Sequence, residues 1–391
     1  MGELLDARTA AERLGVDVRT LYAYVSRGSL RRVPGTDGRS SRYDSDDLEL
    51  LAKRSRPRTL PRPAASIDLV IATRVSTVTD GVVRYRGVNL ADLVAAREPF
   101  ERVCDLLWDD GAGDWGADHG DVTPPPDGLP VLYRFATAVA AMPEAPQEPG
   151  QEVPDWPGYG RRLIGRLVRC PGGSADDGAD DGAAASRLLG DEVATVAARL
   201  WPRWSRLAPT PPRVRALNTA LVLLAEHELA LSTLSVRVAA SARAVPSACV
   251  LAGLSTLSGA LHGGAAAALH ELLARRATGQ QPDLPPRLVA FGHPVHRHGD
   301  PRTSLLLDDV YRFATPVDRA LIESTAALAA APPNVDFALG ALSYAARMPA
   351  EAATAIFAIA RTAGWIAHAA EEYGEPPLRF RGRALGGTQA R

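Results

Sequence analysis

Residues 257–264 read Leu-Ser-Gly-Ala-Leu-His-Gly-Gly, and an alanine-rich stretch follows them. The spacing of apolar residues in that stretch predicts a helix, so His262 should lie just before a helix N-terminus. The paired glycines after the histidine let backbone and ligand approach closely. A neutral imidazole there can donate a hydrogen bond to a developing enolate oxygen. On its own, His262 could equally be an ordinary loop residue.

Residues 290–302 read Ala-Phe-Gly-His-Pro-Val-His-Arg-His-Gly-Asp-Pro-Arg. Asp300 as the N-cap and Pro301 at the first helical position predict the start of another helix. Arg302 would then sit in a fixed first turn, where its planar guanidinium suits a carboxylate. The alternative interpretation of Arg302 is a surface cation.

Two further segments carry ionisable groups on predicted helices. In residues 332–337, Pro-Pro-Asn-Val-Asp-Phe, Asn334 is a predicted N-cap and Asp336 lies in the first turn. The helix dipole would keep Asp336 ionised, as a general base requires, although an ordinary helix-cap acid is the alternative. His227 follows Glu226 inside an apolar helix, where it is either functional or a satisfied core histidine.

Taken together, in this order and spacing, these segments resemble the citrate synthase family. The family's Leu-His-Gly-Gly, Gly-His-x-Val, Asp-Pro-Arg and Asn-Val-Asp-Phe motifs are all present in the residues quoted above. Residues 359–368 match its late Ala-Arg-x-x-Gly-Trp-x-x-His helix, and residues 85–87 match its early Tyr-Arg-Gly. The resemblance runs from about Ser66 to the C-terminus and is strongest after Leu221.

The resemblance implies a reaction and three catalytic residues. Asp336 would remove a proton next to the thioester of acetyl-CoA or propionyl-CoA, and His262 would stabilise the resulting enol or enolate. His293 would polarise and protonate the keto oxygen of oxaloacetate, and hydrolysis of the product thioester would release CoA. The expected product is citrate or 2-methylcitrate, and one methylene is too small a pocket difference for the sequence to decide between them.

The resemblance also implies the groups that bind the two substrates. The expected oxaloacetate ligands are His227, Arg302, Arg361 and Arg381, with Arg381 reaching across a homodimer interface. Arg297 matches a position that contacts a CoA phosphate. A dianionic acceptor needs several fixed guanidiniums, whereas the chemistry itself requires neither a metal nor a redox cofactor. We therefore expect no cofactor beyond the acyl-CoA substrate and no metal site.

The sequence departs from the family pattern at several positions. Glu226 stands where the family usually has Asp, and Ala266 stands where Asn is common. The C-terminal Arg-Pro-Arg-x-x-Tyr pattern appears as Arg-Gly-Arg-Ala-Leu-Gly in residues 381–386, and residues 136–157 lack a recognisable His-Pro-Met segment. These changes indicate altered substrate preference or reduced activity.

The N-terminal residues predict a separate DNA-binding module. Thr9 and Asp17 are predicted caps of two short helices around a turn at residues 15–16, and a hairpin with its turn at residues 34–38 follows. This unit resembles the winged helix-turn-helix of the MerR and excisionase families. The residues expected to face the major groove of DNA or its flanking phosphates are Arg19, Thr20, Tyr22 and Tyr24. Arg39 and Arg42, on the wing, are expected to contact DNA phosphates.

Bulk properties agree with this two-part organisation. The 391 residues carry a formal net charge of -1. Residues 1–63 hold 13 Lys/Arg and 9 Asp/Glu, a net charge of +4, so the remaining residues carry a net charge of -5. A basic piece of this kind is a pointer to nucleic acid. The three scattered cysteines argue against a disulfide framework or structural zinc and suit a reducing cytoplasm. No signal peptide or membrane span is expected.

The predicted fold is therefore mainly helical: a two-domain, citrate synthase-like body preceded by a small winged helix-turn-helix module. The expected boundaries are 1–54 for the module, 55–65 for a Pro/Arg linker, 66–261 with 342–391 for a large subdomain, and 262–341 for a small one. Two alternatives stay open. The chain could be a transcription regulator that uses the synthase-like body as a metabolite sensor, or the module could serve only for protein contact.

Overall fold

The computed structural model describes residues 4–14, 18–26, 30–34, 41–45, 47–48, 69–115, 128–143, 153–170, 195–280, 290–296 and 299–382. The chain divides into two compact units, Met1–Ile71 and Ala72–Arg391. Each unit has a hydrophobic core of its own. The predicted linker at residues 55–65 lies outside the described residues.

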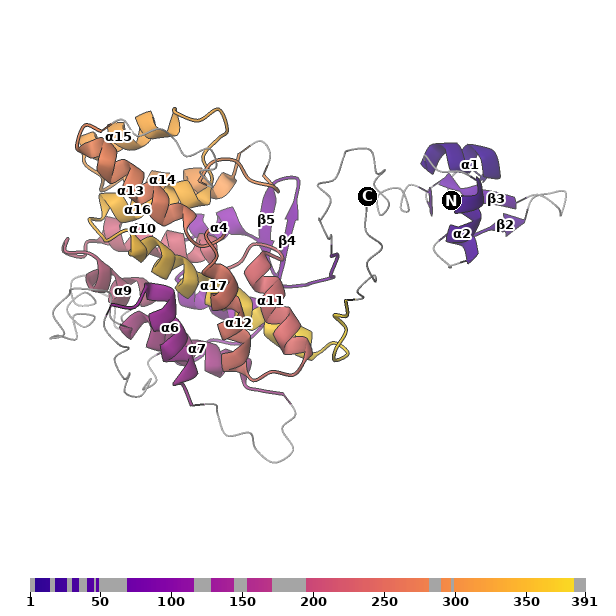
Figure 1. The fold of residues 1–391 in the computed structure, drawn as a ribbon, viewed down its shortest axis with the longest axis horizontal. Coiled ribbons are helices and arrows are strands. Elements are labelled where there is room, and N and C mark those ends of the chain that lie inside the picture. The colour runs from indigo at the N-terminus through magenta and orange to yellow at the C-terminus, as the bar shows by residue number, and fades with distance from the viewer. Residues whose placement is uncertain are drawn as a thin grey trace, which may run out of the picture. The chain divides into compact units, whose positions relative to one another are not determined.

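In its described residues, the N-terminal unit combines the helices α1 and α2 with a three-stranded antiparallel sheet (Figure 1). Its elements are β1 (Leu4–Asp6), α1 (Ala7–Leu14), α2 (Val18–Ser26), β2 (Val33–Pro34) and β3 (Ser41–Asp44). Strands β2 and β3 form the predicted hairpin, and β1 adds a third strand on the other side of β3 that the sequence did not indicate. The predicted cap of the first helix was wrong: the Asp6 carboxylate accepts hydrogen bonds from the backbone N–H groups of Arg8 and Thr9.

The larger unit begins with a small antiparallel sheet of order β4-β5-β6. Its strands are β4 (Ser76–Thr79), β5 (Val82–Tyr85) and β6 (Val88–Asn89). Asp80 and Gly81, with φ of 52° and 78°, form the two-residue turn between β4 and β5. The pairing of β4 with β5 starts at this turn and runs from Thr79 to Ser76.

In the part that the structure describes, the rest of the larger unit is mainly helical, as the sequence predicted. Its helices are α4 (Leu90–Ala95), α5 (Phe100–Trp108), α6 (Val131–Ala140), α7 (Trp156–Arg169), α9 (Val196–Trp204), α10 (Pro211–Leu224), α11 (Leu231–Ser241), α12 (Pro246–Leu257), α13 (Ala265–Ala277), α14 (Pro301–Tyr311), α15 (Pro316–Ala326), α16 (Val335–Ala345) and α17 (Glu351–Tyr373). Among the described residues, no helix combines the length and apolar character that crossing a bilayer requires.

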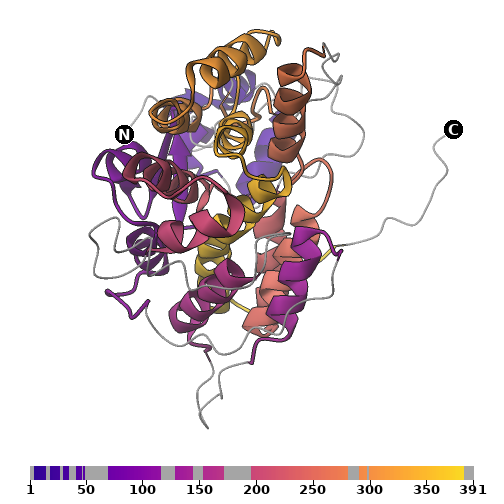
Figure 2. The ribbon, with the colours of Figure 1, turned by 90° about the vertical axis from the view of Figure 1, so that its left-hand side faces the viewer.

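Helix α17 runs through the middle of this unit (Figure 2). Nearly every residue from Ala352 to Ala369 is buried, and the helix contacts α5, α7, α10, α11 and α12. Its alanines give it a thin body, so that neighbouring helices pack close around it. Gly364 marks the closest approach: a Cβ at this position would lie 2.0 Å from a carboxylate oxygen of Glu226.

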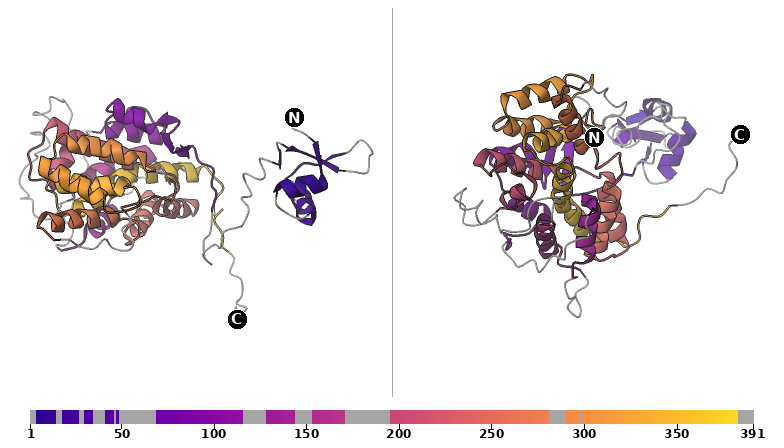
Figure 3. Two further views of the ribbon diagram at one scale, coloured as in Figure 1. Left: turned by 90° about the horizontal axis from the view of Figure 1, so that it is seen from above. Right: turned by 60° about the vertical axis from the view of Figure 1, so that its left-hand side comes forward.

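Helices α13, α14, α15 and α16 lie together on one side of α17 (Figures 1 and 3). The N-termini of three of them are capped by polar side chains: Asp300 for α14, Thr315 for α15 and Asn334 for α16. Gly340 allows α13 and α16 to touch, since a Cβ there would lie 2.6 Å from the carbonyl oxygen of Ala266. These caps fix where α14 and α16 begin, and their first turns carry Arg302 and Asp336.

Candidate active site

A cleft of about 560 Å³ opens in the larger unit, where segments far apart in the sequence meet. Its walls come from the segment between α10 and α11, the turn before α13, the loop at residues 290–296, the first turns of α14 and α16, and α17. Six residues that the sequence singled out line this cleft: His227, His262, His293, Arg302, Asp336 and Arg361.

His262 is held at the cleft by a close turn and a serine. A Cβ on Gly263 would lie 2.3 Å from the carbonyl oxygen of Leu257, so the turn accepts only glycine at that position. The Nε2 atom of His262 lies 2.8 Å from the hydroxyl of Ser232, in the first turn of α11. Burial, with a smaller contribution from Arg361, lowers the pKa of His262 to about 4. The imidazole is therefore neutral at pH 7.

The loop that carries His293 is fastened to the segment that starts α16. The backbone N–H of Gly292 donates to the carbonyl of Pro332, and that of Asn334 donates to the carbonyl of Ala290. The Asn334 side-chain amide also donates to the carbonyl of Gly292, at 2.8 Å. Gly292 has φ of 72°, a left-handed conformation that favours glycine. These contacts bring His293 and Asp336 to the same cleft.

His293 has a defined tautomer. Its Nδ1 atom accepts hydrogen bonds from the backbone N–H groups of Val295 and His296, at 3.1 and 3.3 Å. Burial and the charge of Arg302 lower the pKa of His293 to about 4, although Asp300 opposes them. A neutral ring whose Nδ1 accepts must carry its proton on Nε2. His293 is thus a hydrogen-bond donor through Nε2.

Asp336 lies in the first turn of α16, where the Asn334 side chain accepts from the backbone N–H groups of Asp336 and Phe337. Burial raises the pKa of Asp336 to about 6, and the opposing charges of Arg302 and Arg361 do not cancel that effect. From the sequence we expected the helix dipole to decide the protonation state of Asp336, whereas in the structure burial has the larger effect on its pKa. The carboxylate is still mostly ionised at pH 7.

Three imidazoles lie close together: His227 and His293 line the cleft, and His296 packs against both. The Nε2 atoms of His227 and His296 lie 2.9 Å apart, and the ring centroids of His227 and His293 are separated by 5.0 Å. Although no metal site was expected, one ring nitrogen from each of the three lies within 4.8 Å of the others, a spacing that could hold a metal ion. Metal ligation through Nε2 of His293 would require moving its proton to Nδ1, which already accepts two backbone N–H groups. The site as built therefore favours hydrogen bonding over metal ligation.

Arg302 is 2% exposed, and its guanidinium is held by the side chain of Asp300, the N-cap of α14. Its Nε and Nη2 atoms donate to the two carboxylate oxygens of Asp300, at 2.9 and 2.8 Å. Asp300 also accepts from the backbone N–H groups of Arg302 and Val335. One carboxylate thus starts α14, orients the arginine and ties the start of α16 to both.

Arg361 projects from α17 into the cleft and is also 2% exposed. Its Nε atom donates to the carbonyl of Leu224 at 2.9 Å, and its guanidinium lies 4.7 Å from the ring centroid of Phe357. Burial lowers the pKa of Arg361, whereas the nearby Glu226 carboxylate raises it. Two buried guanidiniums thus face one cleft.

The two remaining predicted ligands, Arg381 and Arg297, differ in what the structure describes. Arg381 is exposed on the segment after α17 and does not line the cleft of this single chain. Arg297 lies outside the described residues.

The predicted DNA contacts are described only in part. Tyr22 is 51% exposed on α2, whereas Tyr24 packs against the small core of its unit. Arg42 lies in β3 and is half-buried, and Arg39 falls outside the described residues, as do the side chains of Arg19 and Thr20.

The sequence missed two residues that shape the cleft. Ser232, the partner of His262, begins α11 and is fully buried, and no spacing rule relates it to a histidine thirty residues later. His296 was quoted within its motif but given no role, and it is 3% exposed against His227. Its position three residues after His293 was the available signal.

Family models match both parts of the chain. Residues 180–381 match the model described as "Citrate synthase, C-terminal domain". Residues 4–56 match the model described as "Helix-turn-helix domain". The first match covers the cleft residues from His227 to Arg361, and the second covers the N-terminal unit.

Similar proteins are found among both sequences and structures. Proteins named "Putative citrate synthase 2" from Mycobacterium tuberculosis (strain ATCC 25618 / H37Rv) and Mycobacterium bovis are 31% identical over 319 residues, which cover 75% of this chain and 83% of the relative. The citrate synthase of Thermotoga maritima MSB8 superposes with a TM-score of 0.60 at 19% identity, and that of Pyrobaculum aerophilum with 0.59 at 23%; each alignment covers 83% of this chain, with 95% and 92% of the respective neighbour. A ternary complex of the Thermoplasma acidophilum citrate synthase with carboxymethyl coenzyme A and oxaloacetate gives a TM-score of 0.56 at 20% identity, over 83% of this chain and 95% of the other.

The pairing of Asp300 with Arg302 predicts a large effect of Asp300→Asn on stability. Asparagine keeps the helix cap but leaves a buried guanidinium without its carboxylate, which should lower the free energy of unfolding by about 3 kcal/mol in urea titrations at pH 7. Burial raises the pKa of Asp300, but the charge and hydrogen bonds of Arg302 outweigh burial and leave it below its usual range. The pair's contribution is therefore present at neutral pH and is lost as the pH falls through that lowered pKa.

The matched control for this prediction is Asp155→Asn. Asp155 also caps a helix, α7, but its side chain is 53% exposed and its ion pair with Arg162 spans 3.9 Å. We expect this variant to change the unfolding free energy by less than about 0.5 kcal/mol. Equal losses in the two variants would show that the Asp300 carboxylate acts only as a cap.

Proposed function

The chain belongs to the citrate synthase family, and from that premise we propose that it condenses a short acyl-CoA with oxaloacetate and releases CoA. The observation that carries the proposal is that the Asp336 carboxylate, the neutral imidazoles of His262 and His293, and two buried guanidiniums meet in a single cleft. Asp336, His262 and His293 are the proposed catalytic residues. Arg302 and Arg361, with His227, are the proposed oxaloacetate ligands.

The first step is removal of a proton from the carbon next to the thioester. Asp336 takes this proton, and a pKa of about 6 makes its carboxylate a stronger base than an exposed aspartate while leaving it ionised at pH 7. His262 donates a hydrogen bond to the thioester oxygen as the enol or enolate forms. If the Ser232 hydroxyl donates to Nε2 of His262, the imidazole proton resides on Nδ1, which is then the donor to substrate.

The second step joins the two carbon skeletons. The enol carbon attacks the keto carbon of oxaloacetate, and the keto oxygen becomes a hydroxyl. His293 donates to that oxygen through Nε2, the nitrogen that its backbone contacts leave protonated. Water then attacks the thioester of the condensed product, the carbon–sulfur bond breaks, and the thiolate of CoA leaves with a proton. These steps transfer protons and form one carbon–carbon bond, so base and hydrogen-bond donors supply the chemistry.

Binding of the dianionic acceptor relies on guanidiniums that do not need to reorganise. Arg302 is already held through Nε and Nη2 by Asp300, which leaves Nη1 for a substrate carboxylate. Arg361 is held through Nε by the carbonyl of Leu224. Their preset orientation reduces the entropy cost of binding. Acetyl-CoA and propionyl-CoA are both candidate partners, and they give citrate and 2-methylcitrate respectively.

Completion of the site involves parts beyond the described cleft. We propose that the chain forms a homodimer in which Arg381 of one protomer contributes to the other protomer's oxaloacetate site. Arg297 is the proposed contact to a CoA phosphate. Closure of a small subdomain at residues 262–341 over the rest would exclude water from the enolate. The Thermoplasma acidophilum enzyme's complex with carboxymethyl coenzyme A and oxaloacetate supports this pair of substrates.

We propose DNA binding as an additional property of the N-terminal unit. The match to a helix-turn-helix family model and the exposed Tyr22 on α2 support it. The hypothesis that the chain is only a regulator, with the synthase-like body as a sensor, is less favoured, because the cleft retains a base and two imidazole donors.

Release of free thiol tests the proposed reaction directly. Purified protein with oxaloacetate and either acetyl-CoA or propionyl-CoA should release CoA only when both substrates are present. Asp336→Asn should lower kcat by about 10²–10⁴ because the general base is lost, while oxaloacetate still protects the protein against heat. Absence of thiol release with every short acyl-CoA tried would overturn the proposal.

The pKa of Asp336 sets an expected acid limb in the rate profile. The base must be ionised, so kcat/KM should fall roughly tenfold per pH unit below about pH 6 and level off above it. The limb should lie well above pH 4, where His262 and His293 would protonate. A profile that stays flat down to pH 5 would contradict the assignment of Asp336 as the base.

A mobility-shift experiment tests the N-terminal unit. The full chain should retard fragments of its own upstream DNA, and Arg42→Ala should weaken binding to all sequences alike, because a wing arginine contacts phosphates and not bases. Repeating the titration with oxaloacetate or CoA shows whether the two units communicate. If the full chain shows no sequence preference at any salt concentration, protein contact becomes the better explanation of this unit.

A further inference from the structure

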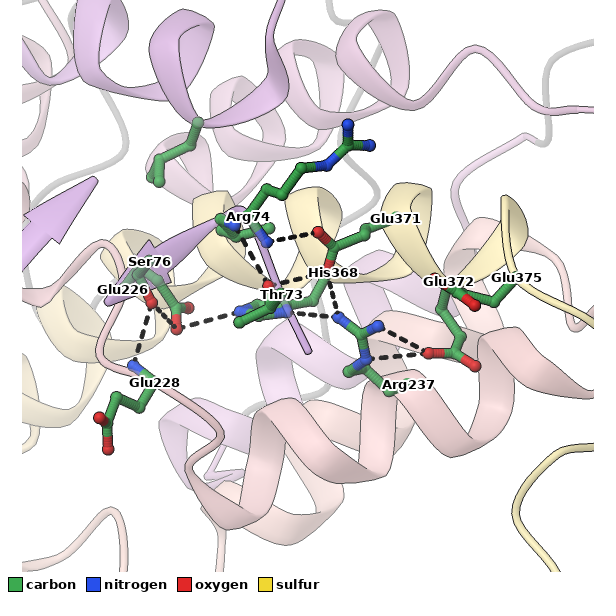
Figure 4. A network of polar contacts seen from close by, with 12 residues as sticks. Thr73, Arg74, Ser76, Glu226, Glu228, Arg237, His368, Glu371, Glu372 and Glu375 are labelled. Carbon is green, nitrogen blue, oxygen red and sulfur yellow. Dashed lines mark hydrogen bonds and ion pairs between the residues drawn. The ribbon is translucent and has the colours of Figure 1, made fainter. Parts of the chain in front are cut away.

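A buried chain of polar groups, unused in the reaction steps above, runs from beside the cleft to the C-terminal segment, and Figure 4 shows its part from Glu226 to Glu372. It links Glu226, next to His227, through His368, Arg237 and Glu372 to Arg379. The first four of these side chains are fully buried, and that of Arg379 is 29% exposed. Burying so many charged groups costs free energy unless each is paired, so a role for this polar chain is expected.

The two hydrogen bonds of this polar chain nearest to Glu226 both donate toward it. A guanidinium only donates, so Nδ1 of His368, 2.9 Å from Nη1 of Arg237, must accept. The ring proton then lies on Nε2, which donates to Oε1 of Glu226 at 3.1 Å. The orientation of the Glu226 carboxylate is therefore dictated from the Arg237 side.

Glu226 in turn shapes the backbone on both sides of His227. The Tyr85 hydroxyl lies 2.8 Å from the Glu226 carbonyl oxygen and 3.2 Å from its backbone nitrogen. The Ser76 hydroxyl donates to Oε1 of Glu226 and accepts from the backbone N–H of Glu228. Glu228 has φ of 51°, a left-handed conformation that a non-glycine residue keeps only when its surroundings enforce it. Through the Ser76 hydroxyl, the Glu226 side chain helps to hold the backbone at Glu228 in this conformation, and His227 lies between these two residues.

Glu226 also connects this polar chain electrostatically to the cleft. Arg237 pairs with Glu371 and Glu372, and Arg379 pairs with Glu372 and, at 3.9 Å, with Glu375. Glu226 instead acts on the guanidinium of Arg361, whose pKa it raises and which lines the cleft. The polar chain therefore holds in place the Glu226 carboxylate, whose charge compensates that of Arg361, a proposed oxaloacetate ligand.

At its far end, the chain is anchored by the segment that follows α17. Arg379 donates through Nε and Nη2 to both carboxylate oxygens of Glu372, each at 2.6 Å. The backbone N–H groups of Leu378 and Arg379 donate to the carbonyl and hydroxyl of Ser241 at the end of α11. Arg379 lies two residues before Arg381, so the same segment leads to a proposed ligand of the partner site.

We propose that Glu226 and His368 are positioning residues that hold His227 for the acceptor dicarboxylate, and that Arg379 couples docking of the C-terminal segment to that site through them. The proposal rests on the proposed function, because it takes the cleft to be the oxaloacetate site. Its consequence is that a change at Arg379, outside the cleft, alters affinity for oxaloacetate while leaving the acyl-CoA site unaffected.

The test measures oxaloacetate binding to the full-length protein by calorimetry, so that it does not depend on turnover. Arg379→Ala should raise the Kd for oxaloacetate about tenfold, as loss of an orienting partner typically does. His368→Leu should do the same or more, whereas His368→Gln, whose amide can still donate to Glu226, should stay within a few-fold of wild type. Arg379→Ala in the His368→Leu background should cause no further weakening, because one path carries both effects.

The matched control is Arg347→Ala. Arg347 also pairs, from a partly exposed position, with a buried carboxylate: its Nη2 donates to both oxygens of Asp318, at 3.1 and 2.8 Å. Losing this pair should lower the melting temperature about as much as Arg379→Ala does, and leave the Kd for oxaloacetate unchanged. A purely structural role for Arg379 predicts that the two variants behave alike in both measurements.

The outcomes separate this inference from the proposed function. If wild type binds oxaloacetate and Arg379→Ala binds it equally well, the coupling is wrong while the proposed function survives. If His368→Leu fails to fold, Arg379→Ala still decides, since its side chain is partly exposed and outside the core. If wild type binds no oxaloacetate, the proposed function fails and this inference fails with it.

Discussion

Two arginine guanidiniums are buried at one cleft, and much of the surrounding structure compensates their charge. Arg302 is matched by the carboxylate of Asp300, which also starts α14 and accepts from the N-terminus of α16. Arg361 is matched less directly, by the carbonyl of Leu224 and the nearby charge of Glu226. Leaving either cation without compensation would cost several kcal/mol, so these contacts constrain how the helices meet.

The same environment sets the protonation states that the proposed chemistry needs. Burial keeps His262 and His293 neutral at pH 7, and the arginine charges add to that effect. Burial also raises the pKa of Asp336, which makes it a better base, while the arginines prevent it from remaining protonated at neutral pH. One cleft thus yields two neutral donors, one ionised base and a strongly positive acceptor site.

Local sequence rules predicted the helix starts at Asp300 and Asn334, because capping depends on neighbours within a few residues. Convergence of the cleft residues came from family resemblance and not from spacing. The contact of His262 with Ser232, and of Glu226 with His368, joins residues far apart in the chain, and no local pattern encodes such pairs.

The most direct measurement is a crystal structure of the protein with oxaloacetate bound. We expect difference density for the dianion in this cleft, with carboxylate oxygens about 3 Å from the guanidiniums of Arg302 and Arg361. Its keto oxygen should face Nε2 of His293, on the side where Asp336 can reach the incoming carbon. Density for the ligand at any other place, with Arg302 still contacting only Asp300, would contradict the account.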